Sequence, residues 1–196
     1  MQTTKQRIMD VAINLFSRYG FKDVTMRQIA GEVGIKASSL YKHYASKENI
    51  LENIFAFFQE KLRQTELEVP AFNSLSDYFT LAYEQFKEIM WEPTVLKIAK
   101  IITAEQMHSR TAREFLAKEM TVKPVQATKY VLDMMKDQAM ISDIDTQVVA
   151  EEYCAYVVYL YFEQNFLHTA PSLDVIDKKM TQHNDFFVRY ILKQGE

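Results

Sequence analysis

A short stretch near the N-terminus concentrates side chains that donate hydrogen bonds. Between Lys36 and Lys47 the chain carries three lysines, two tyrosines and one histidine, and no acidic residue. Ser38 and Ser39 add two hydroxyl groups to the same stretch. Cations and neutral donors grouped in this way suit phosphate oxygens and other anionic acceptors. The first chemistry that the sequence suggests is therefore the binding of a polyanion.

The distribution of charge supports this interpretation. Residues 1–50 contain eight Lys/Arg and four Asp/Glu, a net charge of +4, whereas the whole chain of 196 residues has a net charge of −3. The remaining 146 residues therefore carry −7. An asymmetry of this kind predicts a basic module that meets a polyanion and an acidic module that does not.

Three short helices are predicted to position the basic stretch. Thr3 with Gln6 forms a candidate capping box for a first helix that Gly20 ends, and Thr25 repeats this pattern for a second helix that Gly34 ends. A third helix is expected over 36–42. The apolar residues of the first helix recur at helical spacing: Ile8, Val11, Ala12, Leu15, Phe16 and Tyr19.

The rest of the chain shows the same periodicity. A long fourth helix is predicted over 47–68, and a broad apolar stripe predicts a fifth from Leu75 to Met90. No alternating apolar and polar pattern and no hairpin signal interrupts them. The predicted fold class is therefore all-α. The later helices are expected over 93–107, 111–119, 124–139, 146–168 and 173–193.

The N-terminal pattern resembles the DNA-binding domain of TetR-family transcriptional regulators. The resemblance covers about residues 5–52 and rests on a dozen spaced positions in the segments Gly20–Phe21, Thr25–Ala30, Val33–Ile35, Leu40–Tyr44 and Ser46–Glu48. It implies a three-helix helix-turn-helix domain over 1–46 and a larger helical domain for effector binding and dimerisation over 47–196. Tyr44 stands where this family commonly has Phe.

The resemblance also implies which side chains contact DNA. Residues at the start of the second helix would meet phosphate or base, those of the third helix would enter the major groove, and His43 and Lys47 would hold the DNA backbone. An alternative for His43 is a metal ligand, although no Cys, His or acidic pair lies near it and no metal site is expected. Tyr44 is interpreted as a core aromatic rather than a contact. The predicted DNA-binding residues are Thr25, Arg27, Lys36, Ala37, Ser38, Ser39, Tyr41, Lys42, His43 and Lys47.

The helix predicted over 146–168 is apolar on every side between Tyr153 and Phe162. Such a helix must be buried by its own core and also by a partner chain. In the resembled family the last two helices pair across a two-fold axis. We therefore predict a homodimer whose interface includes Val157, Tyr161, Phe186, Phe187 and Tyr190.

Aromatic and methionine side chains in the middle helices predict an effector cavity. They form an adaptable apolar lining, and tyrosine hydroxyls supply sparse polar anchors for a small apolar or aromatic effector. The alternative is that they are ordinary core residues. Glu105, Gln106 and His108 are possible polar additions, and no cofactor is expected. The candidate ligand-binding residues are Phe79, Tyr83, Phe86, Met90, Trp91, Met107, Met134, Tyr153 and Tyr156.

Together these features predict a DNA-binding regulator, a repressor that a small molecule releases from a pseudo-palindromic operator. A second hypothesis is a helix-turn-helix protein that a partner protein controls without any small-molecule effector. An all-α enzyme is disfavoured, because the four histidines are scattered and Cys154 lies in an apolar run. The polar N-terminus and the single cysteine predict a cytoplasmic protein without disulfides and without a membrane partner.

Overall fold

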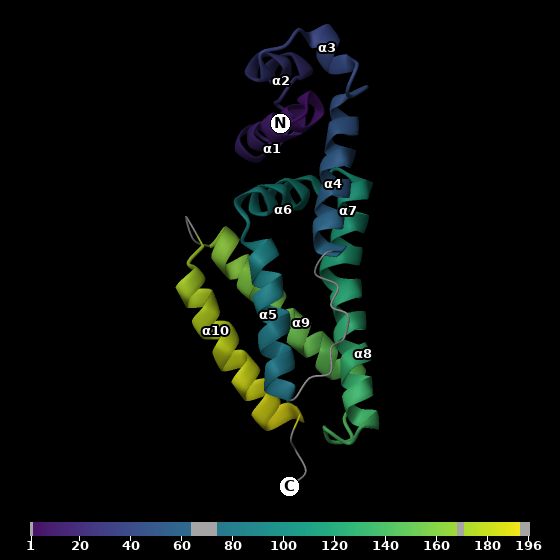
Figure 1. Cartoon of the computed structure of the whole chain (residues 1–196), viewed down its shortest axis with the longest axis vertical. Coiled ribbons are helices and arrows are strands. Elements are labelled where there is room, and N and C mark those ends of the chain that lie inside the picture. Colours follow the sequence, from purple (N-terminus) through teal and green to yellow (C-terminus); the bar gives the residue numbers. More distant parts are fainter. Residues whose placement is uncertain (1, 64–73, 168–170, 193–196) are drawn as a thin grey trace. The chain divides into compact units, whose positions relative to one another are not determined.

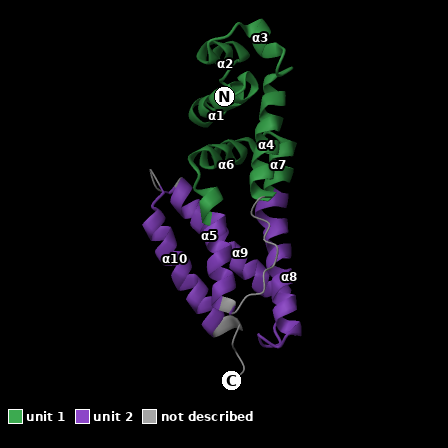
Figure 2. Cartoon of the chain, viewed as in Figure 1, with its two compact units in different colours: residues 1–66, 87–116 green, residues 67–86, 117–196 purple. Residues whose placement is uncertain are grey.

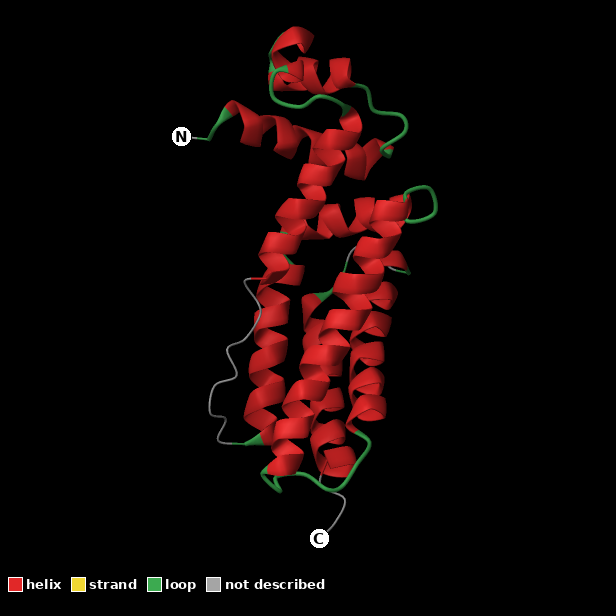
Figure 3. Cartoon of the chain, turned by 90° about the vertical axis from the view of Figure 1, so that its right-hand side faces the viewer, coloured by secondary structure: helices red, strands yellow, loops and turns green. Residues whose placement is uncertain are grey.

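The computed structural model describes residues 2–63, 74–167 and 171–192. Every regular element in these ranges is helical, which confirms the predicted fold class (Figure 3). None of the described helices is both long enough and apolar enough to cross a membrane.

The helices follow the predicted order (Figure 1). The two short segments η1 and η2 are π-helical. The elements are α1 (Thr4–Tyr19), α2 (Met26–Val33), α3 (Ala37–Tyr41), α4 (Lys47–Arg63), α5 (Leu75–Met90), α6 (Pro93–Glu105), α7 (Arg110–Leu116), η1 (Ala117–Val122), α8 (Lys123–Asp137), α9 (Thr146–Phe166), α10 (Leu173–Phe186) and η2 (Phe187–Leu192).

The expected last turn of the fourth helix, 64–68, lies outside the described residues. The break expected between 119 and 124 is absent, because η1 joins α7 to α8 without a loop. Pro124 is the second residue of α8, directly after the π-helical segment, and the helix continues through it.

The chain divides into two compact units (Figure 2). One comprises residues 1–66 and 87–116, and the other comprises 67–86 and 117–196. The first unit is larger than the three-helix domain predicted over 1–46, because α4 and α6 pack with α1. The predicted functional division at 46/47 stays a prediction.

The core of the first unit forms where α1 meets α2, α4 and α6. Ile8 and Phe16 of α1 are buried, as are Ile98 and Ile102 of α6. At the edge of this contact the Nζ of Lys97 donates a 2.6 Å hydrogen bond to the side-chain oxygen of Asn14. The helix-turn-helix therefore rests on a scaffold that includes α6.

The core of the second unit is aromatic. The ring of Phe79 lies 4.8 Å from that of Tyr153 and 5.4 Å from that of Phe187, centroid to centroid. The Tyr153 hydroxyl donates to the side-chain oxygen of Asn184 at 3.0 Å, and the Asn184 amide donates to the Phe79 carbonyl at 3.3 Å. The Tyr153 hydroxyl and the Asn184 amide thus have hydrogen-bond partners inside the core.

Candidate nucleic-acid interface

The turn between α2 and α3 has the geometry that a helix-turn-helix requires. The predicted capping box opens α2: the Thr25 hydroxyl accepts from the Gln28 N–H at 3.2 Å, and the Gln28 side chain accepts from the Thr25 N–H at 2.7 Å. Gly34 ends the helix at φ 77° and ψ 33°, a left-handed conformation that favours glycine. Ile35 N–H then closes the turn on the Ala30 carbonyl at 2.9 Å.

The helix α3 turns one face inward and one outward. Leu40 is fully buried and anchors the inner face. On the outer face Tyr41 is 53% exposed, and Lys36, Ser38 and Lys42 are exposed as well. Ala37 and Ser39 are half-buried, while Thr25, Arg27 and His43 are exposed. Nine of the ten predicted DNA-binding residues thus lie on α2, on α3 or in the turns beside them.

The cations of this surface are available to a ligand. Within the described residues, Arg27, Lys36 and Lys42 make no hydrogen bond or ion pair through their side chains. An exposed cation without a carboxylate partner keeps its full charge for an anion that approaches from solvent. No group of three metal-ligating side chains comes together in the ranges that the structure describes.

Tyr44 belongs to the core, as the sequence indicated. It is 2% exposed, and its hydroxyl lies 3.4 Å from the Lys5 carbonyl, to which it donates. The Lys5 ammonium lies 5.4 Å from the centre of the Tyr44 ring. Burial, and to a smaller degree the Asp10 carboxylate, raises the pKa of the Tyr44 hydroxyl. Tyr44 therefore anchors the end of α3 on α1.

Lys47 makes main-chain contacts that the sequence did not predict. Its ammonium donates to three main-chain carbonyls, those of Phe21 at 2.6 Å, Lys22 at 3.1 Å and Val24 at 2.8 Å. It also lies 4.4 Å from the centre of the Phe21 ring. A lysine ammonium has three N–H donors, so all of them are engaged in this conformation. The phosphate contact expected of Lys47 stays a prediction, whereas the structure shows that it holds the loop between α1 and α2.

Arg7 is a second positioning residue, and the sequence reasoning missed it. Its guanidinium donates to the Val33 carbonyl at 2.9 Å, at the end of α2 beside the Gly34 turn. This contact joins residues 26 apart in the sequence. No spacing rule predicts it, because it exists only once α1 and α2 have packed together.

The predicted effector residues are distributed over both compact units. Phe79, Tyr83, Phe86, Met134, Tyr153 and Tyr156 belong to the second unit, whereas Met90, Trp91 and Met107 belong to the first. Met107 is 77% exposed and lies just beyond the end of α6 at Glu105, and the cavity predicted for it stays a prediction.

The tyrosine hydroxyls expected as ligand anchors are already engaged. Tyr83 donates to the Asp177 carboxylate at 2.6 Å, and Tyr153 donates to Asn184 at 3.0 Å. Phe79 is fully buried among its aromatic neighbours. The alternative interpretation, that these are core residues, fits Phe79, Tyr83 and Tyr153.

Some of the predicted dimer residues are buried within the chain and others are exposed. Tyr161 and Phe187, which were predicted at the dimer interface, are buried within the single chain. Val157 is half-buried and Phe186 is exposed, while the side chain of Tyr190 lies outside the described part. Exposed residues of α9 recur every three or four positions along one face, and Gln147 and Glu151 beside this face are exposed as well. The residues of the face are Val148, Glu152, Ala155, Tyr159 and Phe162.

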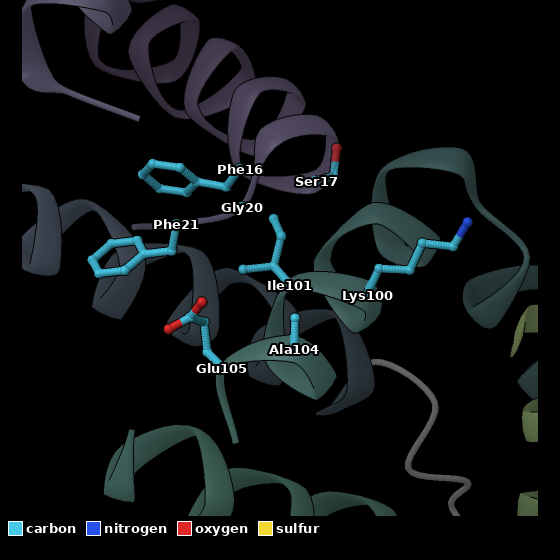
Figure 4. Close-up of a pocket in the computed structure, with 8 residues that line it drawn as sticks. All are labelled: Phe16, Ser17, Gly20, Phe21, Lys100, Ile101, Ala104 and Glu105. Carbon is cyan, nitrogen blue, oxygen red and sulfur yellow. The ribbon is translucent and has the colours of Figure 1, made fainter. Parts of the chain in front are cut away.

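A small pocket opens in the first unit, between the end of α1 and the end of α6 (Figure 4). Its volume is about 200 Å³. Phe16, Phe21 and Ile101 supply apolar walls, and Glu105 supplies the one carboxylate in the lining. Glu105 was named from the sequence as a possible polar lining residue, but the pocket that it lines contains none of the nine predicted ligand-binding residues.

The N-terminal residues match known transcriptional regulators. Residues 8–54 fit the family model described as bacterial regulatory proteins, tetR family. The chain is 31% identical over 70 residues to the HTH-type transcriptional regulator AcrR of Shigella flexneri, a match over 36% of this chain and 33% of that protein. It is 45% identical over 58 residues to the biofilm operon negative transcriptional regulator IcaR of Staphylococcus epidermidis, over 28% and 31% of the two chains. The chain thus spans about a third of the length of these curated relatives.

Solved structures extend the likeness in fold to nearly the whole chain. A putative transcriptional regulator from Saccharomonospora viridis, in complex with choline, is 19% identical and superposes with a TM-score of 0.74 over 97% of this chain and 98% of that one. A putative TetR-family regulator from Mesorhizobium loti is 15% identical, with a TM-score of 0.72 over 94% and 95%. The matched relatives named above are transcriptional regulators, not enzymes. Residues 8–54 therefore match the tetR family of bacterial regulatory proteins, and the chain as a whole shares the helical fold of these solved structures.

Proposed function

We propose that this protein is a sequence-specific DNA-binding transcriptional regulator that acts as a homodimer on a pseudo-palindromic operator. The observation that carries the proposal is the outer face of α3, where Tyr41, Lys36 and Lys42 stand exposed beside a well-formed Gly34 turn. A helix held in this way enters the major groove with its N-terminal residues against base edges.

Each group on this face has a chemical task in the proposed complex. Ala37 and Ser38 are small, so the start of α3 can approach the floor of the groove closely. The hydroxyls of Ser38 and Tyr41 donate to base edges or phosphates, and the Lys36 and Lys42 ammonium groups pair with the DNA backbone. His43 adds a further donor at the end of α3.

The start of α2 provides a second contact with the DNA backbone. The first N–H groups of a helix have no partner within the helix, and the helix dipole places partial positive charge there. Thr25 caps this end, and Arg27 lies exposed in the first turn of α2. A phosphate at this end would therefore meet main-chain donors and a guanidinium together.

Dimerisation is proposed through α9 and α10. The exposed face of α9 includes Val148, Tyr159 and Phe162, and on α10 Val175 and Phe186 are exposed as well. Apolar side chains at this density on two adjacent helices are typical of a surface that a second protein covers. A second copy would make the contact symmetric and would set two α3 helices about 34 Å apart, one turn of DNA.

Repression and control by a small molecule are the finer parts of the proposal. The relative IcaR is named a negative regulator, and another curated relative, KstR2 of Rhodococcus jostii, is named a repressor. A ligand that binds one spacing of the two α3 helices better than another shifts the population toward it and releases the operator. Tight packing of Phe79, Tyr153 and Phe187 favours a second candidate, in which a partner protein provides the control.

In vitro selection of bound DNA from a random library tests the proposal. The expected product is an inverted repeat with half-sites about one helical turn apart, bound by a dimer. Light scattering on the complex measures its stoichiometry. Failure to enrich any sequence, or enrichment of a single asymmetric half-site bound by one chain, would contradict the proposal.

A further inference from the structure

The pocket between α1 and α6 contains an unpaired acid. Glu105, the last residue of α6, is 8% exposed, which is deeper burial than carboxylates usually reach without a partner. Within the described residues its side chain makes no hydrogen bond and no ion pair. Buried carboxylates are normally paired or hydrogen-bonded, because desolvation of an isolated charge is costly. The pocket therefore presents a carboxylate acceptor that a solute from outside the chain can reach.

The nearby lysine does not fill this role. Lys100 also lines the pocket, but Figure 4 shows its ammonium pointing away from Glu105, while the Glu105 carboxylate points toward Phe21. The Lys47 ammonium lies 4.4 Å from the centre of the Phe21 ring and donates its hydrogen bonds to main-chain carbonyls. Neither cation of this neighbourhood reaches the carboxylate.

The other walls define what can bind. The rings of Phe16 and Phe21 lie 5.2 Å apart in an edge-to-face arrangement, and Ile101 adds an aliphatic surface. Aromatic rings attract cations as well as apolar groups. A volume of about 200 Å³ admits only a small molecule.

We propose that this pocket binds a small aliphatic ammonium compound. Its N–H groups donate to the Glu105 carboxylate, and its alkyl part packs on Phe16, Phe21 and Ile101. The site is separate from the aromatic cluster of the second unit, where the sequence predicted an effector. Binding at this site does not depend on the proposed DNA-binding function.

Binding at this site also has a route to the helix-turn-helix. Phe21 forms one wall of the pocket, and its carbonyl accepts the 2.6 Å hydrogen bond from Lys47 that holds the loop before α2. An occupant that moves Phe21 therefore acts on the loop that leads to Thr25. This effect on DNA binding rests on the proposed function. It is measured as a change in operator affinity, separately from the binding of the compound.

Calorimetric titration of the full chain at neutral pH tests the binding step. The probes are butylammonium chloride and its neutral counterpart butan-1-ol. Butylammonium is expected to bind with one-to-one stoichiometry, and E105Q is expected to weaken it at least about ten-fold, the usual scale for loss of a charge-assisted hydrogen bond. The matched control E88Q removes one negative charge from an exposed site of the same unit and leaves the affinity unchanged.

A second variant tests the same pocket in case E105Q does not fold. Ala104 lines the pocket but is exposed, so A104L fills the cavity, keeps Glu105 and leaves the core intact. A104L is expected to weaken the binding of butylammonium as E105Q does. Its helicity by circular dichroism should equal that of the parent chain. Equal affinity of E105Q and the parent chain, equal affinity for butan-1-ol and butylammonium, or no binding to the folded parent chain at millimolar probe overturns the proposal.

The two proposals fail in different ways. If DNA selection succeeds and butylammonium does not bind, the pocket assignment is wrong and the regulator stands. If butylammonium binds through Glu105 and no DNA is selected, the pocket assignment stands and the proposed DNA-binding function is wrong. If butylammonium binds but leaves operator affinity unchanged, the coupling through Phe21 is wrong and the site alone remains.

Discussion

The ammonium of Lys47 donates a 2.6 Å hydrogen bond to the carbonyl of Phe21, 26 residues earlier in the chain. This contact ties the first turn of α4 to the loop that precedes α2, and two further carbonyls of the same loop share the ammonium. The position of α2 and α3 relative to α1 therefore depends on a lysine that the sequence alone assigns to DNA.

Replacement of Lys47 by alanine should destabilise the N-terminal unit. Three hydrogen bonds from a charged donor are lost, at a cost of about 1–3 kcal/mol given the partial exposure of the side chain. Urea denaturation measures this cost, and hydrogen exchange of the amides between Gly20 and Thr25 should accelerate. The control K42A changes stability by less than about 0.5 kcal/mol, because Lys42 is exposed and unpaired within the described part. Unchanged exchange in K47A would show that the loop is held by other contacts.

Tyr41 and Tyr44 should respond differently to truncation. Tyr41→Ala should leave the free energy of unfolding nearly unchanged and cost about 1–3 kcal/mol of operator binding, because its side chain is exposed on the reading face. Tyr44→Ala removes a buried ring and should destabilise the fold by about 3–5 kcal/mol. Thermal denaturation and a binding titration on the selected operator separate the two effects. Equal operator affinity of folded Y41A and the parent chain would remove Tyr41 from the interface.

The lysines of α3 and its borders should set the salt dependence of DNA binding. Each phosphate contact that is lost lowers the slope of log K against log salt by about one. K36A and K42A should each produce this change at every DNA sequence, with little effect on stability, because both side chains are exposed. Titrations at several salt concentrations measure the slope. A change in sequence preference with an unaltered slope would instead assign that lysine to a base.

The second unit should lose stability at acidic pH because of His183. Its ring stacks on that of Tyr156 at 4.0 Å, and its buried Nε2 has no hydrogen-bond partner among the residues that the structure describes. Burial lowers the pKa of the imidazole to about 4. The unfolded chain takes up this proton near pH 6.5 and the folded chain only near 4. Stability from this group is complete above about pH 6.5 and falls as the pH drops toward 4.

The variant H183F isolates this contribution. It keeps an aromatic ring in the stack and removes the titrating group, so unfolding between pH 6.5 and 4 should show a shallower loss of stability than in the parent chain. H43F serves as the control, because His43 is exposed and its replacement should leave the pH profile unchanged. Parallel profiles for H183F and the parent chain would show that His183 is not the sensitive group.

The exposed face of α9 should control the oligomeric state. Phe162 is 49% exposed, and F162E places a charge where a second copy is proposed to pack. Light scattering should shift from twice the chain mass of 23.0 kDa toward the mass of a single chain. Q147E adds the same charge at an exposed position next to this face and should leave the dimer intact. A parent chain that is itself monomeric at micromolar concentration would refute the proposed interface.

Local sequence determined the helical class of the elements and the ends of the first two helices. The capping boxes at Thr3 and Thr25 and the left-handed turn at Gly34 are present as predicted, because a cap or a positive φ depends on residues within one turn of the helix. Helical periodicity likewise identified the outer face of α3, including Tyr41 and Lys42. For the same reason Tyr44 could be recognised as a core residue from sequence alone.

Tertiary structure decided which side chains are free and where a cavity lies. Periodicity gives a helix its apolar stripe but does not say whether a neighbouring helix or a ligand covers the stripe. Phe79 was therefore predicted to line a ligand cavity and Phe187 to lie at a dimer interface, whereas in the structure the two rings pack against one another. Lys47 and Arg7 owe their tasks to carbonyls that folding brings near them from more than twenty residues away. Glu105 became distinctive only when α6 packed on α1, because burial of an unpaired charge is a property of the assembled core and not of its spacing in the chain.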